Sequence, residues 1–242
     1  MTNSTVQFLV PFSPEIIAEA KAHALAMYPQ EACGIVSEDT YFVVPNLSSD
    51  PNLGFEMPPN TWLDYAPVQG VLHSHTLAKG GINVSKADME GYLATGVPWG
   101  VCLTDGTSCT DHIWLDKNNR DLPLIGRPFI PGIWDCFSLG LAHFWQELGI
   151  EIKDYPRDAG WWDRGENMFV DHFLDAGFVM IPKEEAQVND VLLMAIGGST
   201  LNHCAIVLGG NMILHHLTKR LSRRDIYGNW IKMTRKALRY AP

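Results

Sequence analysis

The stretch DCFSLGLAHFWQELG, residues 135–149, decides the fold class of the second half of the chain. Asp135 is a good N-cap, so we expect a helix to begin there. Helices come first in this half and strands follow, which predicts an α+β unit. A second helix is expected near ENMFVDHFLDAG, and strands are expected at DVLLMAI (190–196), HCAIVLG (203–209), MILHHL (212–217) and near ALRY.

The first half of the chain mixes helix and strand. Ser13-Pro14-Glu15 is a good helix start, and apolar residues recur at helical spacing as far as Met27. The remaining expected elements are strands at 32–37, 41–45 and 68–75, a short helix at 85–96 and a hairpin at 98–115. The polar, Pro/Gly-punctuated stretch 116–132 is the expected linker. We therefore predict two domains, residues 1–120 and 121–242, with a mixed α/β sheet in the first.

Composition excludes several classes of protein. The chain has 242 residues, 46% hydrophobic and 19% charged, with a net charge of −9 that argues against nucleic-acid binding. No apolar run approaches the roughly 20 residues that span a bilayer, and the N-terminus lacks the pattern of a secretory signal. Five cysteines without CxxC spacing predict a reduced, cytoplasmic chain.

A candidate metal site lies in HSHTLAKGGINVSKAD, residues 73–88. His73 and His75 are two apart on an expected strand and so point to the same face. Asp88, in the first turn of the next helix, can supply a third zinc ligand and leave one position for water. Glu31 is the candidate proton shuttle, and Ser85 can donate a hydrogen bond to a developing oxyanion. This set would make a hydrolytic zinc site.

An ordinary helix cap also explains part of this pattern. Ser85-x-x-Asp88 is close to a capping box, and a cap accounts for both residues without a metal. The HxH pattern also occurs by chance in many proteins. Spacing alone leaves the two interpretations about equal.

A second candidate site centres on Cys136, at the first position of the helix after Asp135. The helix dipole favours a thiolate there. His203 is the candidate base, and either His215 or His216 can orient it, depending on the hairpin register. A two-residue loop would pair His203 with His216, whereas a three-residue loop would make His215 its diagonal neighbour. The alternative is that Cys136 is one more buried core cysteine.

The first-half pattern resembles the JAMM metalloprotease motif. The resemblance implies that His73, His75 and Asp88 bind Zn²⁺, that Glu31 is the general acid/base and that Ser85 aids the oxyanion. The sequence departs from the family at Thr76, where proline is usual, and in the slightly long stretch between His75 and Ser85.

The second-half pattern resembles the NlpC-type cysteine peptidases, which have papain-like folds. It rests on DCFSLG, NHCAIVLGG and the histidine twelve residues after His203. The resemblance implies Cys136 as nucleophile, His203 as base and His215 as orienting residue, and it implies a peptide substrate from bacterial peptidoglycan. RPFIPGIWDC lacks the tyrosine common in the family, and Asn189 replaces a usual glycine.

The order of the two motifs resembles the tail-tip proteins of lambda-like tailed phages. That resemblance implies a peptidase with other phage tail-tip proteins as partners. It places the chain in the host cytoplasm during tail assembly, or at the virion tail tip and then in the host periplasm. Two further segments carry the likeness. DYPRDAGWWDRGENMFVDHF is interpreted as core packing beside the cleft or as a substrate groove, and SRRD (222–225) as a surface turn or as a docking surface. The alternative function is a structural subunit whose peptidase domains dock without turnover.

Overall fold

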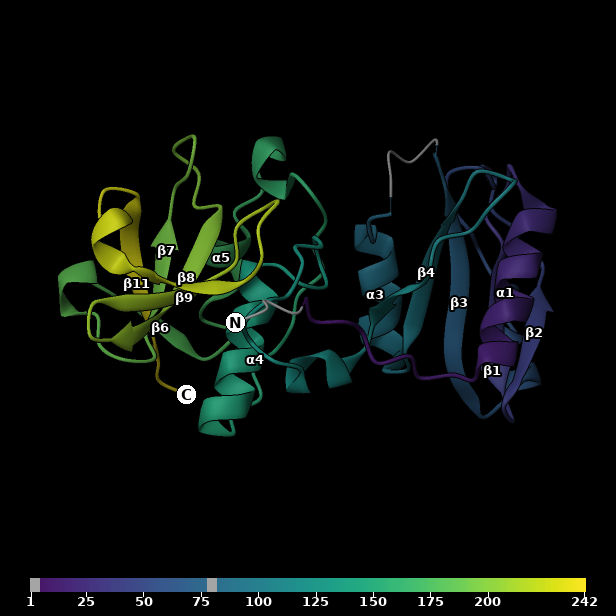
Figure 1. The fold of residues 1–242 in the computed structure, drawn as a ribbon, viewed down its shortest axis with the longest axis horizontal. Coiled ribbons are helices and arrows are strands. Elements are labelled where there is room, and N and C mark those ends of the chain that lie inside the picture. The colour runs from purple at the N-terminus through teal and green to yellow at the C-terminus, as the bar shows by residue number, and fades with distance from the viewer. Residues whose placement is uncertain (1–4, 78–81) are drawn as a thin grey trace. The chain divides into compact units, whose positions relative to one another are not determined.

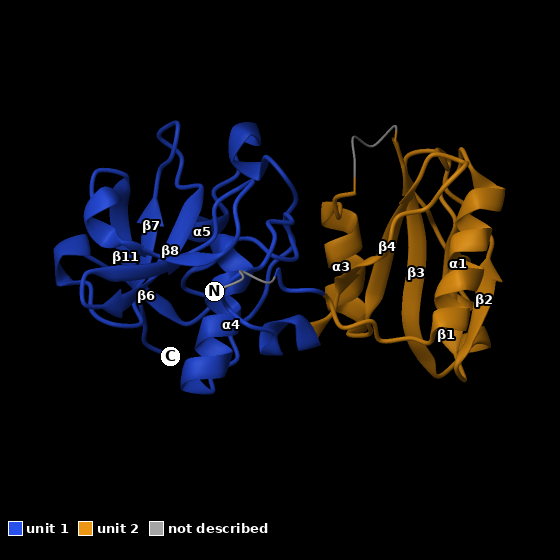
Figure 2. Ribbon diagram, in the orientation of Figure 1, with its two compact units in different colours: residues 1–7, 118–242 blue, residues 8–117 orange. Residues whose placement is uncertain are grey.

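The computed structural model describes residues 5–77 and 82–242. The chain divides into two compact units, which Figure 2 colours separately. The N-terminal unit comprises residues 8–117, and the C-terminal unit comprises residues 118–242 together with the segment that precedes residue 8. Part of the expected loop between His75 and Ser85, residues 78–81, lies outside the described residues.

The N-terminal unit is a mixed sheet with the strand order β2-β1-β3-β4-β5. Only the β3–β4 pair is parallel. The elements are α1 (Pro14–Met27), β1 (Cys33–Ser37), β2 (Thr40–Val44), α2 (Thr61–Asp64), β3 (Val68–Thr76), α3 (Lys86–Thr95), β4 (Trp99–Thr104) and β5 (Ile113–Leu115). Helix α3 is the crossover between the parallel strands, as a parallel connection requires.

Two helices cover opposite faces of this sheet (Figure 1). Helix α1 buries Ile16 and Ala20 against a face that includes Leu72. Helix α3 lies on the other face, where its Gly91 leaves room for the Trp99 ring. Because side chains alternate along β3, His73 and His75 share the α3 face and Leu72 the α1 face.

The C-terminal unit is an antiparallel sheet with the strand order β10-β9-β8-β7-β11-β6. Its main elements are α4 (Cys136–Leu148), α5 (Met168–His172), β6 (Phe178–Ile181), β7 (Val191–Met194), β8 (His203–Gly209), β9 (Met212–His215), β10 (Arg223–Ile226) and β11 (Thr234–Tyr240). Short 3-10 turns occupy Lys117–Asp121, Trp161–Arg164, Lys183–Glu185 and Tyr227–Asn229. No helix in the described part of the chain is both long and apolar enough to cross a membrane.

The core of this unit lies between α4 and the sheet. Leu139 and Phe144 of α4 pack with Ile206 of β8 and Leu214 of β9. The opposite face of the sheet has its own apolar cluster around Leu192. The α+β arrangement expected for this half is present, with its helix ahead of its main strands.

Much of the segment expected as a linker, 116–132, packs into the C-terminal unit instead. Arg127 is buried, and its backbone N–H donates to Ser222 Oγ at 2.9 Å. Its guanidinium donates to the Pro123 carbonyl at 2.8 Å. Val6 of the preceding segment donates to the Gly126 carbonyl. Composition indicated a polar connection but carried no sign of these long-range hydrogen bonds.

The β8–β9 hairpin combines features of both registers considered for it. Gly209 pairs with Met212, so the tip is a two-residue turn of Gly210 and Asn211, both with positive φ. The register then shifts, and Ala205 pairs with His215. Residue 208 is therefore the extra residue of a β-bulge. Beyond the bulge, the strands have the pairing that a three-residue loop would give.

Candidate active site and candidate metal centre

Cys136 is the first residue of α4. The N-cap Asp135 accepts from the Ser138 N–H at 2.9 Å, and Ser138 Oγ accepts from the Asp135 N–H at 2.9 Å, which completes a capping box. The cap fixes the start of the helix, and so it fixes where the Cys136 sulfur emerges. The N-cap and N1 positions expected from the sequence are those observed.

Cys136 lines a cleft of about 790 Å³ together with His203. A hydrogen bond with the Cys204 thiol and one with His203 lower the pKa of Cys136 to about 5, although burial opposes ionisation. The same contact with Cys136, together with burial, raises the pKa of Cys204. The cysteine at the helix terminus is therefore the thiolate of the pair near neutral pH.

His203 and His215 are in contact across the β8–β9 hairpin. His203 Nε2 lies 3.2 Å from His215 Nδ1. Burial, and then the neighbouring His203, lower the pKa of His215 to about 4, so this ring is neutral at pH 7. The Trp230 ring packs edge-on against His215, with centroids 4.6 Å apart. His216 also lines the cleft but packs against the Phe129 ring.

Asp225 lies next to His215 on the side away from His203. Asp225 was not predicted from the sequence as a residue of the site. Its Oδ2 lies 3.6 Å from His215 Nε2 and accepts from the Arg223 guanidinium at 2.8 Å. Asp225 belongs to the SRRD segment expected as a surface turn or docking surface, and that segment instead leads into the edge strand β10. The pairing of β10 with β9 brings Asp225 to the site.

A buried ionic cluster holds Asp135, and sequence reasoning also missed it. Arg157 donates to both oxygens of Asp135, at 2.7 and 3.1 Å, and to Asp154 Oδ1 at 2.6 Å. Burial opposes ionisation of Asp135, but Arg157 and backbone donors keep its pKa below the ordinary value. Asp135 on its own raises the pKa of Cys136, so the charge of Arg157 protects the thiolate. This contact accounts for DYPR in the segment at 154–157.

The two tryptophans of that segment line the cleft wall. Trp161 is buried in the core cluster, and Trp162 packs on that cluster with its ring edge-on to Trp161. Both rings also face the cleft that contains Cys136. The two tryptophans therefore pack in the core and also form part of the cleft wall.

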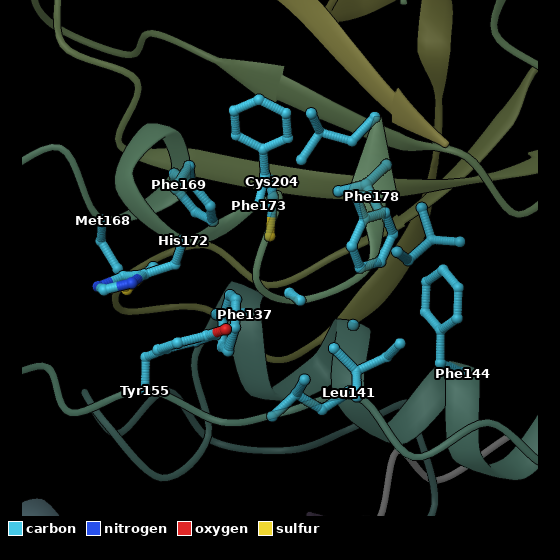
Figure 3. A pocket seen from close by; sticks show the side chains of 16 residues that line it. Phe137, Leu141, Phe144, Tyr155, Met168, Phe169, His172, Phe173, Phe178 and Cys204 are labelled. Atoms are coloured by element: carbon cyan, nitrogen blue, oxygen red, sulfur yellow. The ribbon is translucent and has the colours of Figure 1, made fainter. Parts of the chain in front are cut away.

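A separate apolar pocket of about 500 Å³ lies between α4 and the sheet. Figure 3 shows the sulfur of Cys204 among aromatic side chains there, including Phe137, Phe144 and Phe178. Tyr155 and His172 stack at 4.2 Å in its lining. Cys204 thus contacts the nucleophile candidate while its side chain borders a pocket lined mainly by apolar side chains.

Asn189, the residue found where the NlpC-type pattern has glycine, lies just ahead of β7. Its φ is +72°, a left-handed conformation that glycine and asparagine adopt most readily. Its Oδ1 lies 3.0 Å from His143 Nε2 on α4. The replacement therefore keeps a backbone conformation that glycine also adopts and adds a contact to helix α4.

In the N-terminal unit, the three candidate metal ligands converge. His73 Nε2 and His75 Nε2 lie 3.3 Å apart, and each lies 3.2 Å from one oxygen of Asp88. All three residues are buried. Burial opposes ionisation of Asp88, but the two histidines hold its pKa far below the ordinary range. The carboxylate is therefore charged at any pH at which the protein is used.

These distances fit a zinc ion. Ligand atoms about 2.0–2.1 Å from a tetrahedral metal lie about 3.3 Å from one another, and the three observed separations are 3.3, 3.2 and 3.2 Å. Two imidazole nitrogens facing each other and a carboxylate offer three lone pairs toward one point. A cation at that point removes the repulsion between the three lone pairs. Two imidazole nitrogens and one carboxylate oxygen are a ligand set that suits zinc.

Glu31 and Ser85 flank this cluster in different ways. The Ala32 N–H donates to Ser74 Oγ at 2.9 Å, and the Ala32 carbonyl accepts from the Ser74 N–H at 3.0 Å. Continuing this antiparallel pairing sets Glu31, which is fully buried, opposite His75 on the same face. Ser85 Oγ accepts from the Asp88 N–H at 3.1 Å, and Asp88 Oδ2 accepts from the Ser85 N–H at 2.7 Å. The capping box considered for Ser85 and Asp88 is thus present together with the ligand cluster.

Comparison with known proteins gives a family match in the second half of the chain and a relative that covers nearly the whole chain. Residues 126–239 match the NlpC/P60 family. The tail tip assembly protein K of Escherichia phage N15 is 34% identical over 237 residues, which cover 90% of this chain and 91% of that protein. The chain belongs to the tail tip assembly protein K family. It is thus a phage tail tip assembly protein with an NlpC/P60 domain, which is a cysteine peptidase domain.

The chain is also similar to a second relative and to solved structures. The tail tip assembly protein K of Escherichia phage lambda is 33% identical over 194 residues, covering 76% of this chain and 89% of that protein. The NlpC/p60 domain of the peptidoglycan hydrolase SagA is 21% identical with a TM-score of 0.32, covering 48% of this chain and 89% of that one. An NlpC/P60 protein from Bacillus cereus is 16% identical with a TM-score of 0.31, covering 96% of this chain and 67% of that one. Membership of the family rests on the sequence matches.

Proposed function

We propose that this tail tip assembly protein is a cysteine peptidase that cuts the stem peptides of bacterial peptidoglycan. One observation carries the proposal. Cys136, at the N-terminus of α4, shares a cleft with His203 and has its pKa lowered to about 5 by hydrogen bonds with Cys204 and His203. The substrate class is inferred from the match of residues 126–239 to the NlpC/P60 family, because resemblance to NlpC-type peptidases implies a peptide substrate from peptidoglycan.

The residues support a two-step acyl transfer. The Cys136 thiolate attacks the scissile carbonyl carbon, and the carbon–nitrogen bond breaks as the amine takes a proton from His203. Water then attacks the thioester, gives its proton to His203 and releases the acid and the thiol group. The capping box engages the N–H groups of Asp135 and Ser138, so those of Cys136 and Phe137 remain to bind the oxyanion.

Digestion of peptidoglycan tests the proposal. Purified Gram-negative peptidoglycan is incubated with the wild-type protein, Cys136→Ala and the control Cys109→Ala, and released muropeptides are identified by mass spectrometry. We expect stem-peptide cleavage by the wild type and the control and its loss in Cys136→Ala. Cleavage by Cys136→Ala at the wild-type rate would overturn the assignment. An inactive wild type, folded by circular dichroism, would favour the structural function.

We further propose that His73, His75 and Asp88 bind zinc in the N-terminal unit, in a site of the JAMM type. The equal separations of their ligand atoms support this. When bound, zinc lowers the pKa of a coordinated water and so supplies a nucleophile near neutral pH. Glu31 accepts and returns the proton from its buried position opposite His75, and Ser85 donates to the oxyanion.

Metal content and chelator sensitivity test the zinc site separately. We expect about one zinc per chain by elemental analysis of the wild type, close to none in the double variant His73→Ala/His75→Ala, and no change in the control His172→Ala. Zinc retention in the double variant would overturn the site. Chelator-sensitive peptide cleavage that survives Cys136→Ala would assign catalysis to it, whereas bound zinc without such cleavage would assign a scaffold function.

We place the protein in the host cytoplasm during tail assembly, and then at the virion tail tip with access to the host periplasm. Other tail-tip proteins are the proposed partners. The proposal rests on membership of the tail tip assembly protein K family. Immunodetection in purified virions tests it, because a protein needed only for assembly would be absent from them.

A further inference from the structure

The side chains behind His203 form a chain that ends in a carboxylate. His203 Nε2 meets His215 Nδ1 at 3.2 Å, and His215 Nε2 faces Asp225 Oδ2 at 3.6 Å. His215 is 1% exposed, so water does not compete for its second nitrogen. Among the described residues no group makes a hydrogen bond to His215 Nε2, and the carboxylate stands just beyond hydrogen-bond length.

The carboxylate itself is held in place. Asp225 Oδ1 accepts from the Ile226 N–H at 2.8 Å, and Oδ2 accepts from Arg223 at 2.8 Å. Burial opposes its ionisation, but these donors and the Trp230 side chain keep its pKa below the ordinary value. A fixed, charged acceptor therefore faces one nitrogen of a neutral imidazole. A proton on His215 Nε2 would otherwise be buried without an acceptor, so the carboxylate favours a proton at that nitrogen.

The position of one proton decides whether His203 can act as a base. The contact between the two histidines holds a single proton. If it is on His203 Nε2, then His203 Nδ1 has a lone pair for the Cys136 thiol, and the proton of His215 must be on Nε2. If it is on His215 Nδ1, then His203 carries its proton on Nδ1 and cannot accept one from Cys136. A carboxylate facing His215 Nε2 stabilises only the first arrangement.

We propose that Asp225 is a positioning residue that fixes the tautomer of His215 and, through it, the tautomer of His203. The proposal rests on the assignment of Cys136, His203 and His215 to the peptidase site. Asp225 does not touch the reacting atoms. It acts through His215, as the buried aspartate of a serine-protease triad acts through its histidine.

Imidazole ¹⁵N NMR of the full-length protein tests the tautomer directly, without requiring activity. Signals of His215 are assigned by their loss in His215→Gln. We expect a protonated Nε2 and an unprotonated Nδ1 in the wild type, and loss of this preference in Asp225→Asn. Arg224→Met, which removes the neighbouring exposed arginine of β10 on the other face of the strand, is the matched control and should keep the wild-type tautomer. A protonated Nδ1 in the wild type, or an unchanged tautomer in Asp225→Asn, would overturn the proposal.

Kinetics then separate this inference from the proposed function. On a stem-peptide substrate we expect Asp225→Asn to lower kcat about 10- to 100-fold with KM little changed, and Arg224→Met to change kcat less than about threefold. An inactive wild type with the expected tautomer would count against the peptidase alone. An active wild type with equal kcat in Asp225→Asn would count against Asp225 alone.

Discussion

Nε2 of His203 lies 3.2 Å from Nδ1 of His215, across a hairpin whose register is shifted by a bulge at residue 208. Without the bulge, the Gly209–Met212 pairing would continue to Ala205 opposite His216, and His216 instead of His215 would share the face of His203. One extra residue in β8 therefore selects which histidine stands behind the candidate base. This agrees with the general finding that bulges next to active sites redirect side chains.

The reactivity of Cys136 toward iodoacetamide should titrate in the acid range. The hydrogen bonds with Cys204 and His203 lower its pKa to about 5, so most of the thiol is ionised at pH 7. Alkylation rates measured by peptide mapping from pH 4 to 9 give the midpoint for Cys136. Buried Cys33, whose pKa is raised to about 12, should not react and is the internal control. A Cys136 midpoint near that of a free thiol, about 8.5, would contradict the geometry.

Arg157→Met should destabilise the C-terminal unit by about 3–5 kcal/mol, because it leaves the buried Asp135 and the half-buried Asp154 without their counter-charge. Urea unfolding followed by tryptophan fluorescence measures the change. Arg164→Met is the matched control, since Arg164 pairs with Asp158 and Glu166 at the surface and should contribute less than about 1 kcal/mol. Equal losses in the two variants would show that the buried cluster has no special role.

His112→Phe should reduce the acid sensitivity of folding. Burial, with Lys21 and His73 nearby, lowers the pKa of His112 to about 4, against about 6.5 in the unfolded chain. Between these values the unfolded state binds a proton that the folded state does not, so stability falls as the pH drops from 6.5 toward 4. Above 6.5 the residue has no such effect.

Urea unfolding at pH 7.5, 6, 5 and 4.5, with chelator present throughout, measures this dependence. The slope of unfolding free energy against pH should be smaller in His112→Phe by up to about 1.4 kcal/mol per pH unit. Parallel slopes for wild type and variant would show that His112 has the same pKa in the folded protein as in the unfolded chain.

Ser85→Ala should destabilise the N-terminal unit by about 1 kcal/mol, because it removes the N-cap of α3. Ser85→Gly is the matched control, since glycine at an N-cap costs only about a few tenths of a kcal/mol. If the serine also serves the proposed zinc site as an oxyanion donor, both variants should lose metal-dependent cleavage while keeping zinc. If Ser85→Ala loses stability but cleavage is unchanged, Ser85 acts only as the N-cap of α3.

Local signals in the sequence predicted the parts of the sites that depend on neighbouring residues. Asp135 as N-cap placed Cys136 at N1, and the i, i+2 spacing placed His73 and His75 on one face. The capping signal of Ser85 fixed the start of α3 and, with it, the position of Asp88. Each inference needed only the period of a helix or a strand.

Long-range relationships were beyond such reasoning. Asp225 reaches His215 only because β10 pairs with β9, and the sequence SRRD has no apolar alternation to indicate a strand. Arg157 reaches Asp135 across 22 residues that include helix α4, and an arginine between two aspartates also fits an exposed loop. The hairpin register depended on a bulge that the Gly-Gly-Asn turn alone does not specify. In each case the missing information was a tertiary contact.

Mass spectrometry of the protein quenched in acid during turnover of a stem peptide tests whether Cys136 is the nucleophile. We expect a mass increase equal to the acyl fragment, located on the proteolytic peptide that contains Cys136, and its absence in Cys136→Ala. Release of the cleavage products without any acyl adduct on Cys136, together with undiminished cleavage by Cys136→Ala, would contradict the assignment of Cys136 as nucleophile.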